Sequence, residues 1–370
     1  MPLREHGGGY RLWSGIIGQY NLFHECTHGG NSRGFSCWPL KKLPQMDAWK
    51  DYKYSSRLDL DRSKHVKELL FQQIQQALNM APPPPPLKKE EPKPAAPKPP
   101  AAKPPVEAPV LQRRRELDEE LDFLPECQEL ILIWHVTTDV FLSSSKKQHT
   151  DDQILKYMEA IKAISDYMAF LAAVRPDMLP GLKLRSQHRA TAEALSILWK
   201  RETSKSTSPY TTTRGEEKLV EILKREEDRP PIRALGNSER SKVSALYNLS
   251  IILSDATTFG ELLEIMLRRK DWKETLDKVL KERSNSWKRF VFLIPDMEKP
   301  RPKPFYLLDL LKLMLKSWVR MLIYVSIRCS RDSHAKQLGR GCELTTIVWI
   351  LSEHAGIFAS KPPMDDKSNS

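Results

Sequence analysis

The 370 residues are enough for one large or two ordinary domains, and because 40% of them are hydrophobic they can build a sizeable core. The N-terminus has no apolar stretch of signal-peptide length, and no run of 18 uncharged apolar residues marks a membrane-spanning helix. Five cysteines without framework spacing are typical of reduced thiols in a cytosolic setting. The net charge of +12 is concentrated in residues 1–115. Residues 1–80 carry 11 Lys/Arg against 7 Asp/Glu, and residues 81–115 carry 8 against 3. The rest of the chain is nearly balanced, so no nucleic-acid partner is predicted.

Residues 1–80 form an N-terminal segment with one clear helix. The stretch RLWSGIIGQYNLF, residues 11–23, is compatible with a short helix or a short strand. An amphipathic helix is expected to begin at Ser63, a residue type that favours the N-cap position. Its apolar residues recur on one helical face, which needs a partner to dock on: Val66, Leu69, Leu70, Ile74, Ala77 and Leu78.

Residues 81–112 have the composition of a linker. Thirteen prolines lie between residues 81 and 110, including the run Pro82–Pro86, and they alternate with Lys and Ala. Such a segment cannot form a core and is expected to be disordered or extended as polyproline II, at about 3.1 Å per residue. The alternative interpretation is a docking site at residues 82–109 for a proline-recognition domain.

Residues 113–358 are predicted to be helical almost throughout, so the expected fold class is all-α, an irregular multi-helix bundle. An apolar helix is expected at 128–142, and a second at 151–174, with acidic residues in its first turn and Pro176 after its end. Residues 238–272 indicate one helix or two, with a break near Thr257–Gly260. Further helices are expected at 186–202 and 215–228, and residues 359–370 are expected to be a disordered tail.

The stretch 305–358 is expected to be the core C-terminal unit, and 305–327 is its most apolar run. Its polar residues are spaced by three or four positions and fall on one helical stripe: Asp309, Lys312, Lys316 and Arg320. Four charges at the centre of a bilayer would cost roughly 10–14 kcal/mol, whereas the twelve Leu, Ile, Val and Phe residues would return only about 4–7 kcal/mol. The balance favours a buried helix of a soluble bundle.

A polar hinge at 328–342 separates this run from a second apolar run at 343–358. The hinge contains Gly339-Arg340-Gly341, which is too short for a phosphate-binding loop and predicts a helix C-cap and turn. A small anion site near the following helix N-terminus is a hypothesis that rests on Arg331, Lys336 and Arg340. No cofactor is expected, and three tryptophans are expected in the structural core: Trp134, Trp318 and Trp349.

Four phrases occur in an order that resembles one known family. They are LIWHVTTDVF at 132–141, AISDYMAFLAAVRPDMLPG at 163–181, ALYNLSIILSDA at 245–256, and WVRMLIYVSIRCSRDSHAKQLGRGCELTTIVWILSEHAGI at 318–357. The chain is similar here to the plant family that joins the domain of unknown function 4220 to a C-terminal domain of unknown function 594. The resemblance implies a membrane-associated family with a helical C-terminal region and no established activity.

The sequence departs from that family in identifiable places. The N-terminal membrane spans typical of the family are missing, Cys342 stands where the family phrase has a small residue, and Glu353 falls in an apolar stretch. The resemblance therefore implies a membrane location, whereas the residues of this chain alone indicate a cytoplasmic one.

The pair His135 and Asp139 lies one helical turn apart, in a spacing that acyltransferases use to let a His base activate a nucleophile. The Asp-Phe-Gly loop that such enzymes also need is absent. The competing interpretation is a partly buried histidine hydrogen-bonded to Asp139, and we expect no catalytic residue.

Two groups of His and Cys residues contain metal-ligand types without zinc-finger spacing, and no metal site is expected. The first group is His24, Cys26, His28 and Cys37. The second group is looser, and a hydrogen-bonded hinge is its alternative interpretation: Cys329, His334, Cys342 and His354.

Three classes of function stay open from the sequence. The first is a non-enzymatic helical interaction or scaffold region with an unknown protein partner. The second is a peripheral membrane or anionic-lipid binder that uses the basic N-terminal part. The third is an acyltransferase-like enzyme that uses His135 and Asp139. Abundant apolar stripes and the lack of a catalytic constellation favour the first.

Overall fold

The computed structural model describes residues 15–28, 56–78, 127–145, 151–181, 185–204, 212–228, 249–268, 274, 306–338 and 343–355. The predicted all-α class is confirmed, because these ranges hold ten α-helices, one short 3-10 helix and a single two-stranded sheet. The Pro-rich segment 81–112 and the tail 359–370 lie outside the described residues, as does the proposed proline-recognition site at 82–109.

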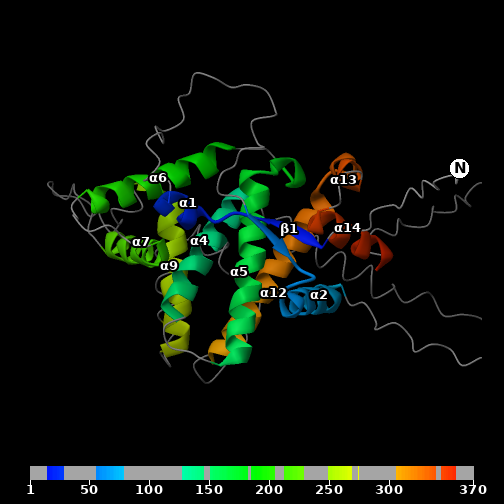
Figure 1. Cartoon of the computed structure of the whole chain (residues 1–370), viewed down its shortest axis with the longest axis horizontal. Coiled ribbons are helices and arrows are strands. Elements are labelled where there is room, and N and C mark those ends of the chain that lie inside the picture. Colours follow the sequence, from blue (N-terminus) through cyan, green and yellow to red (C-terminus); the bar gives the residue numbers. More distant parts are fainter. Residues whose placement is uncertain are drawn as a thin grey trace, which may run out of the picture.

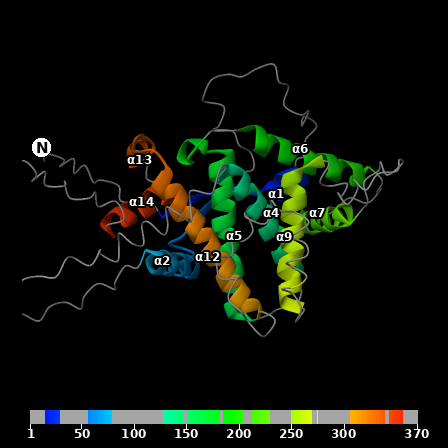
Figure 2. The same cartoon turned by 180° about the vertical axis from the view of Figure 1, so that it is seen from behind.

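Helix α4 (Cys127–Ser145) is the central helix of the bundle. Every residue from Leu130 to Leu142 is buried, the polar residues His135, Thr137, Thr138 and Asp139 included. It lies between α5 (Asp152–Ala173) and α9 (Ile251–Arg268), which flank it in both views (Figures 1 and 2).

Helix α9 runs unbroken through Thr257–Gly260, so the break expected there does not occur. A Cβ atom at Gly260 would lie 2.6 Å from Val140 Cγ1 of α4. The glycine therefore lets the two helices approach closely, which explains its presence in a helix interior.

Helix α5 begins at the N-cap Asp151, whose carboxylate accepts the Gln153 backbone N–H at 2.8 Å. It ends before a 3-10 turn, η4 (Pro176–Met178), where proline cannot continue the helix. Besides α4 it contacts α12, α2 and β1, so it touches both the N-terminal and the C-terminal parts of the chain.

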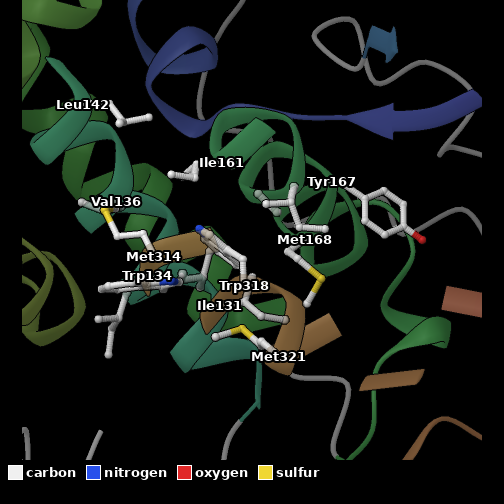
Figure 3. Close-up of a cluster of buried hydrophobic side chains, with 14 of the residues drawn as sticks. Ile131, Trp134, Val136, Leu142, Ile161, Tyr167, Met168, Met314, Trp318 and Met321 are labelled. Carbon is white, nitrogen blue, oxygen red and sulfur yellow. The ribbon is translucent and has the colours of Figure 1, made fainter. Parts of the chain in front are cut away.

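Helix α12 (Leu307–Arg328) corresponds to the most apolar run of the sequence. Lys312 and Lys316 are exposed, Asp309 and Arg320 are half-buried, and fifteen other residues of the helix are buried. Trp318 packs beside Trp134 (Figure 3), with ring centroids 6.4 Å apart. Its indole N–H is donated to Thr138 Oγ1 at 3.1 Å. Among the described residues, no helix is both long and apolar enough to cross a bilayer.

The described parts of the N-terminal segment, residues 15–28 and 56–78, pack on this bundle and share its hydrophobic core. Strand β1 (Ile16–Gln19) pairs antiparallel with β2 (Ser56–Asp59), with Ile17 opposite Leu58. Strand β1 lies on α5 so closely that a Cβ at Gly18 would meet the Phe170 ring at 2.4 Å. The ambiguous stretch at 11–23 thus contains a strand and the start of a helix.

Helix α1 (Leu22–His28) follows β1 and lies against α6 (Arg185–Thr203) and α7 (Thr212–Glu227) (Figure 1). Helix α2 (Lys64–Ala77) packs on α5 and α12 through Val66, Leu70 and Ile74. Ser63 occupies the N-cap position, but its side chain makes no capping hydrogen bond.

Two short helices complete the C-terminal unit. Helix α13 (Arg331–Leu338) follows α12, and α14 (Leu344–His354) packs on α12. The hinge residues 339–342, with the expected Gly339-Arg340-Gly341 turn, lie outside the described residues.

Candidate functional site

The most concentrated polar chemistry lies where the N-terminal segment meets α4 and α5. Helix α4 places His135 and Asp139 one turn apart, and α5 places Lys162, Ser165 and Asp166 opposite them. The start of α1 contributes one amide side chain. We call this set the Asn21 cluster: Asn21, His135, Asp139, Lys162, Ser165 and Asp166.

One ammonium group bridges the two carboxylates of the cluster. Lys162 Nζ lies 2.6 Å from Asp139 Oδ1 and 3.0 Å from Asp166 Oδ1. Burial opposes the charge on Lys162, but the two carboxylates outweigh it and raise the pKa of this amine. Burial also acts against ionised Asp139, yet Lys162, His135 and Asn21 together hold the pKa of that carboxyl below its usual value.

Asn21 joins three helices through one side chain. Its amide donates to Asp139 Oδ2 at 2.7 Å and to Asp166 Oδ1 at 3.1 Å. Its carbonyl oxygen accepts the His24 backbone N–H at 2.9 Å and so caps the first turn of α1. The cluster is therefore incomplete without the N-terminal segment.

His135 is fully buried and uses both ring nitrogens. The Leu22 backbone N–H donates to Nε2 at 3.3 Å, so the proton of the neutral ring sits on Nδ1 and is donated to Ser165 Oγ at 2.8 Å. Burial, together with the charges of Lys162 and His188, lowers the pKa of His135 to about 4, although Asp139 opposes this shift.

The structure corrects the expected bond between His135 and Asp139. The ring is fully rather than partly buried, and Nε2 lies 3.9 Å from Asp139 Oδ2, which is too long for a hydrogen bond. Because the lone pair on Nε2 already accepts a backbone N–H, the ring has no position left from which to take a proton from a substrate.

Further polar contacts fix the N-terminal segment to the bundle. The Tyr20 hydroxyl donates to the Glu25 carboxylate, and His188 of α6 lies 3.0 Å from the same hydroxyl. Burial raises the pKa of Glu25 above its usual value, and the hydrogen bond from Tyr20 only partly offsets this. Two histidines on the segment also pair with carboxylates of the bundle: His24 with Glu216 at 3.0 Å and His65 with Glu159 at 2.5 Å.

The residues considered as metal ligands near the N-terminus make other contacts. Cys26 is buried, its thiol lies 3.6 Å from the Ala192 carbonyl oxygen, and burial raises its pKa to about 12. The His28 side chain and Cys37 lie outside the described residues. Across the described ranges, no group of three or more His, Cys, Asp or Glu residues is arranged to hold a metal ion.

The hinge histidine is hydrogen-bonded within the C-terminal unit. His334 Nε2 lies 3.0 Å from the Ser326 carbonyl oxygen and must donate to it, so Nδ1 accepts from the Thr346 hydroxyl at 3.0 Å. Its ring stacks on the half-buried Trp349 with centroids 4.8 Å apart. The other members of this group are dispersed: Cys329 is buried, His354 is exposed and Cys342 is outside the described residues.

A second polar set joins the end of α5 to the start of α14. The Tyr167 oxygen accepts the Thr345 backbone N–H at 3.1 Å, and Arg175 donates to Glu343 at 3.0 Å. Arg175 also contacts Asp177 through two nitrogens at 3.2 Å. We call these five residues the Glu343 junction: Tyr167, Arg175, Asp177, Glu343 and Thr345.

The residues of the proposed anion site make no common contact in the described part of the chain. Arg331 is largely exposed and lies 3.8 Å from Glu353, Lys336 is exposed, and Arg340 is outside the described residues. The structure thus brings no pair of them together within the described residues. At the N-terminus of α14 itself, the Thr345 N–H is already donated to Tyr167.

Comparison with known proteins gives one family match. Residues 308–357 match the family described as "Protein of unknown function, DUF594", and the match covers nearly all of α12 together with α13 and α14. The C-terminal part of the resemblance seen in the sequence is therefore confirmed. No curated protein matches the chain, and no solved structure matches it.

Proposed function

We propose that this chain is a non-enzymatic helical scaffold in which α5 joins an N-terminal segment to the helices that match DUF594. One observation carries the proposal: the reactive side chains of α4 and α5 are used for bonds between elements. Lys162 contacts Asp139, and Asp166 accepts a hydrogen bond from Asn21. Tyr167 and Arg175 contact the start of α14.

Catalysis needs a group that can exchange a proton or a bond with a substrate. His135 has both nitrogens engaged and no exposed surface. The thiols of Cys26 and Cys127 are buried, and burial raises the pKa of each to about 12, so they are not thiolates at neutral pH. These features support an architectural role for the same residues.

The test compares two variants of the full chain in cells, each first shown to be folded by circular dichroism. His135→Asn removes the imidazole, while Glu343→Gln weakens the Glu343 junction. Because each variant removes a bond between elements, a scaffold predicts that cross-linked partners are reduced in both. If the wild-type chain instead transforms a metabolite in cell extract and folded His135→Asn does not, the scaffold proposal is wrong.

The remaining family resemblance extends the proposal. The phrases at 132–141, 163–181 and 245–256 support a relation of α4, α5 and α9 to the domain of unknown function 4220 of membrane-associated plant proteins. On this basis the scaffold acts at a membrane. Fractionation of the chain expressed from its complete gene tests this location, and recovery in the cytosolic fraction alone would contradict it.

Liposome co-sedimentation separates the scaffold from the lipid-binding alternative. That alternative rests on the excess of Lys and Arg in residues 1–115, and two of these residues pair locally, Arg62 with Asp59 and Lys67 with Asp61. Pelleting with anionic vesicles at low salt that disappears at high salt would support lipid binding. Lack of pelleting at both salt concentrations would remove it.

A further inference from the structure

The charges of the Asn21 cluster do not balance. Asp139 and Asp166 share the single ammonium group of Lys162, and His135 is neutral. The side chains of the two carboxylates are only 9% and 14% exposed, so one negative charge is left in a site largely removed from water. Two like charges in one site oppose each other's ionisation, and such a pair takes up one proton readily.

The hydrogen bonds show where that proton fits. Asp139 accepts with both oxygens, from Lys162 at 2.6 Å and from Asn21 at 2.7 Å. His135 has no ring nitrogen to spare. For Asp166, the contacts with Lys162 and Asn21 both end on Oδ1, so a proton on Oδ2 leaves them intact.

We propose that the Asn21 cluster contains a one-proton switch: Asp166 becomes protonated at Oδ2 under mildly acidic conditions, and this proton strengthens the hold on the N-terminal segment, against the opposite pH effect of His135. The link to the segment is direct, because Asn21 donates to both carboxylates and the Tyr20 backbone N–H donates to the Asp166 carbonyl oxygen at 3.1 Å. Protonation removes the repulsion between the carboxylates that Asn21 bridges.

The electrostatic surroundings agree with this assignment. Burial raises the pKa of Asp166 to about 6, and the charge of Asp139 adds to this shift, although Lys162 and Asn21 oppose it. A raised carboxyl pKa means that the folded chain binds the proton before the unfolded chain does. The stabilisation is therefore absent well above pH 6 and grows as the pH falls through 6.

The groups that face the cluster come from four helices. They are Asn21 and the Leu22 N–H from α1, His135 and Asp139 from α4, Lys162 and Ser165 from α5, and His188 from α6, which acts on His135. Burial lowers the pKa of His188, as it does that of His135, to about 4, so both rings stay neutral in the folded chain at pH 5–7.

Hydrogen exchange on the full chain tests the switch. Asp166→Asn presents an uncharged side chain at every pH, so its opening constants carry no titration at this position. The opening constant of each Leu22–His28 amide in the variant is divided by the same constant in the wild-type chain. This ratio should rise about tenfold from pH 7.5 to pH 5. Taking the ratio cancels the contribution of His135, and α9 amides serve as the internal reference. A ratio that stays within twofold overturns the proposal.

Asp152→Asn is the matched control, because Asp152 lies on the same helix and pairs with Lys156 at the surface. For this control, the ratio of the Leu22–His28 opening constants, variant over wild type, should stay constant from pH 7.5 to pH 5. A rise equal to that of Asp166→Asn would also overturn the proposal. A second measurement needs no variant: the carboxyl carbon of Asp166 in the wild-type chain should titrate by NMR with a midpoint near pH 6. A midpoint below pH 4.5, or titration of the His135 ring in its place, contradicts the assignment.

Discussion

At the scale of single residues, the side chain of Asn21 stabilises the contacts among three helices, although Asn21 itself lies just before the first of them. Asn21→Ala removes the cap of α1 and two hydrogen bonds to buried carboxylates, so we expect unfolding to become easier by about 2–4 kcal/mol. Asn21→Asp keeps the capping oxygen but adds a third carboxylate. We expect it to be the more destabilising variant at pH 7.5, with the gap narrowing at pH 5, as measured by urea unfolding.

His135 gives a pH dependence of defined sign. Burial lowers its pKa in the folded chain to about 4, so the neutral ring contributes fully above its unfolded pKa near 6.5 and loses that contribution as the pH falls toward 4. Relative to His135→Asn, the free energy of unfolding of the wild-type chain should fall by about 2 kcal/mol between pH 7.5 and pH 5. Parallel urea titrations at both pH values measure this, and a constant difference would refute it.

At the scale of elements, the contact of α4 with α9 depends on a glycine. Gly260→Ala places a methyl group 2.6 Å from Val140 Cγ1, so we expect a loss of about 1–3 kcal/mol in place of the gain that alanine gives in a free helix. Val140→Ala removes the clashing atom and serves as the partner in a double-mutant cycle. Additive losses in the double variant would show that the two helices do not meet at this contact.

The same scale shows what sequence patterns can predict. The helical state of α12 and α4 follows from their apolar runs and from the spacing of the polar residues on α12. The Asn21 cluster does not, because Asn21 lies 118 residues from Asp139 and 145 from Asp166, and no periodicity links them. The spacing of His135 and Asp139 indicated a local bond, but the Leu22 backbone N–H and Ser165 had the better geometry.

At the scale of the whole molecule, the N-terminal segment is part of the core. Ile17, Tyr20, Phe23 and Leu70 of this segment are almost completely buried, and each would lose its cover if the segment separated from the bundle. Burying a side chain of this size contributes about 1.5–3 kcal/mol, so their sum is comparable to the stability of an ordinary domain. The sequence alone placed this segment apart from the helical domain because a proline-rich stretch lies between them.

A chain that starts at residue 113 should therefore aggregate or bind a hydrophobic dye, whereas the full chain should not. A matched control keeps every residue and adds a protease site between Lys98 and Pro99. After cleavage, the N-terminal piece should remain bound in gel filtration at pH 7, because its contacts with α5, α6, α7 and α12 do not depend on the covalent connection. Separation of the two pieces under native conditions would mean that the tether, and not the packing, holds the segment in place.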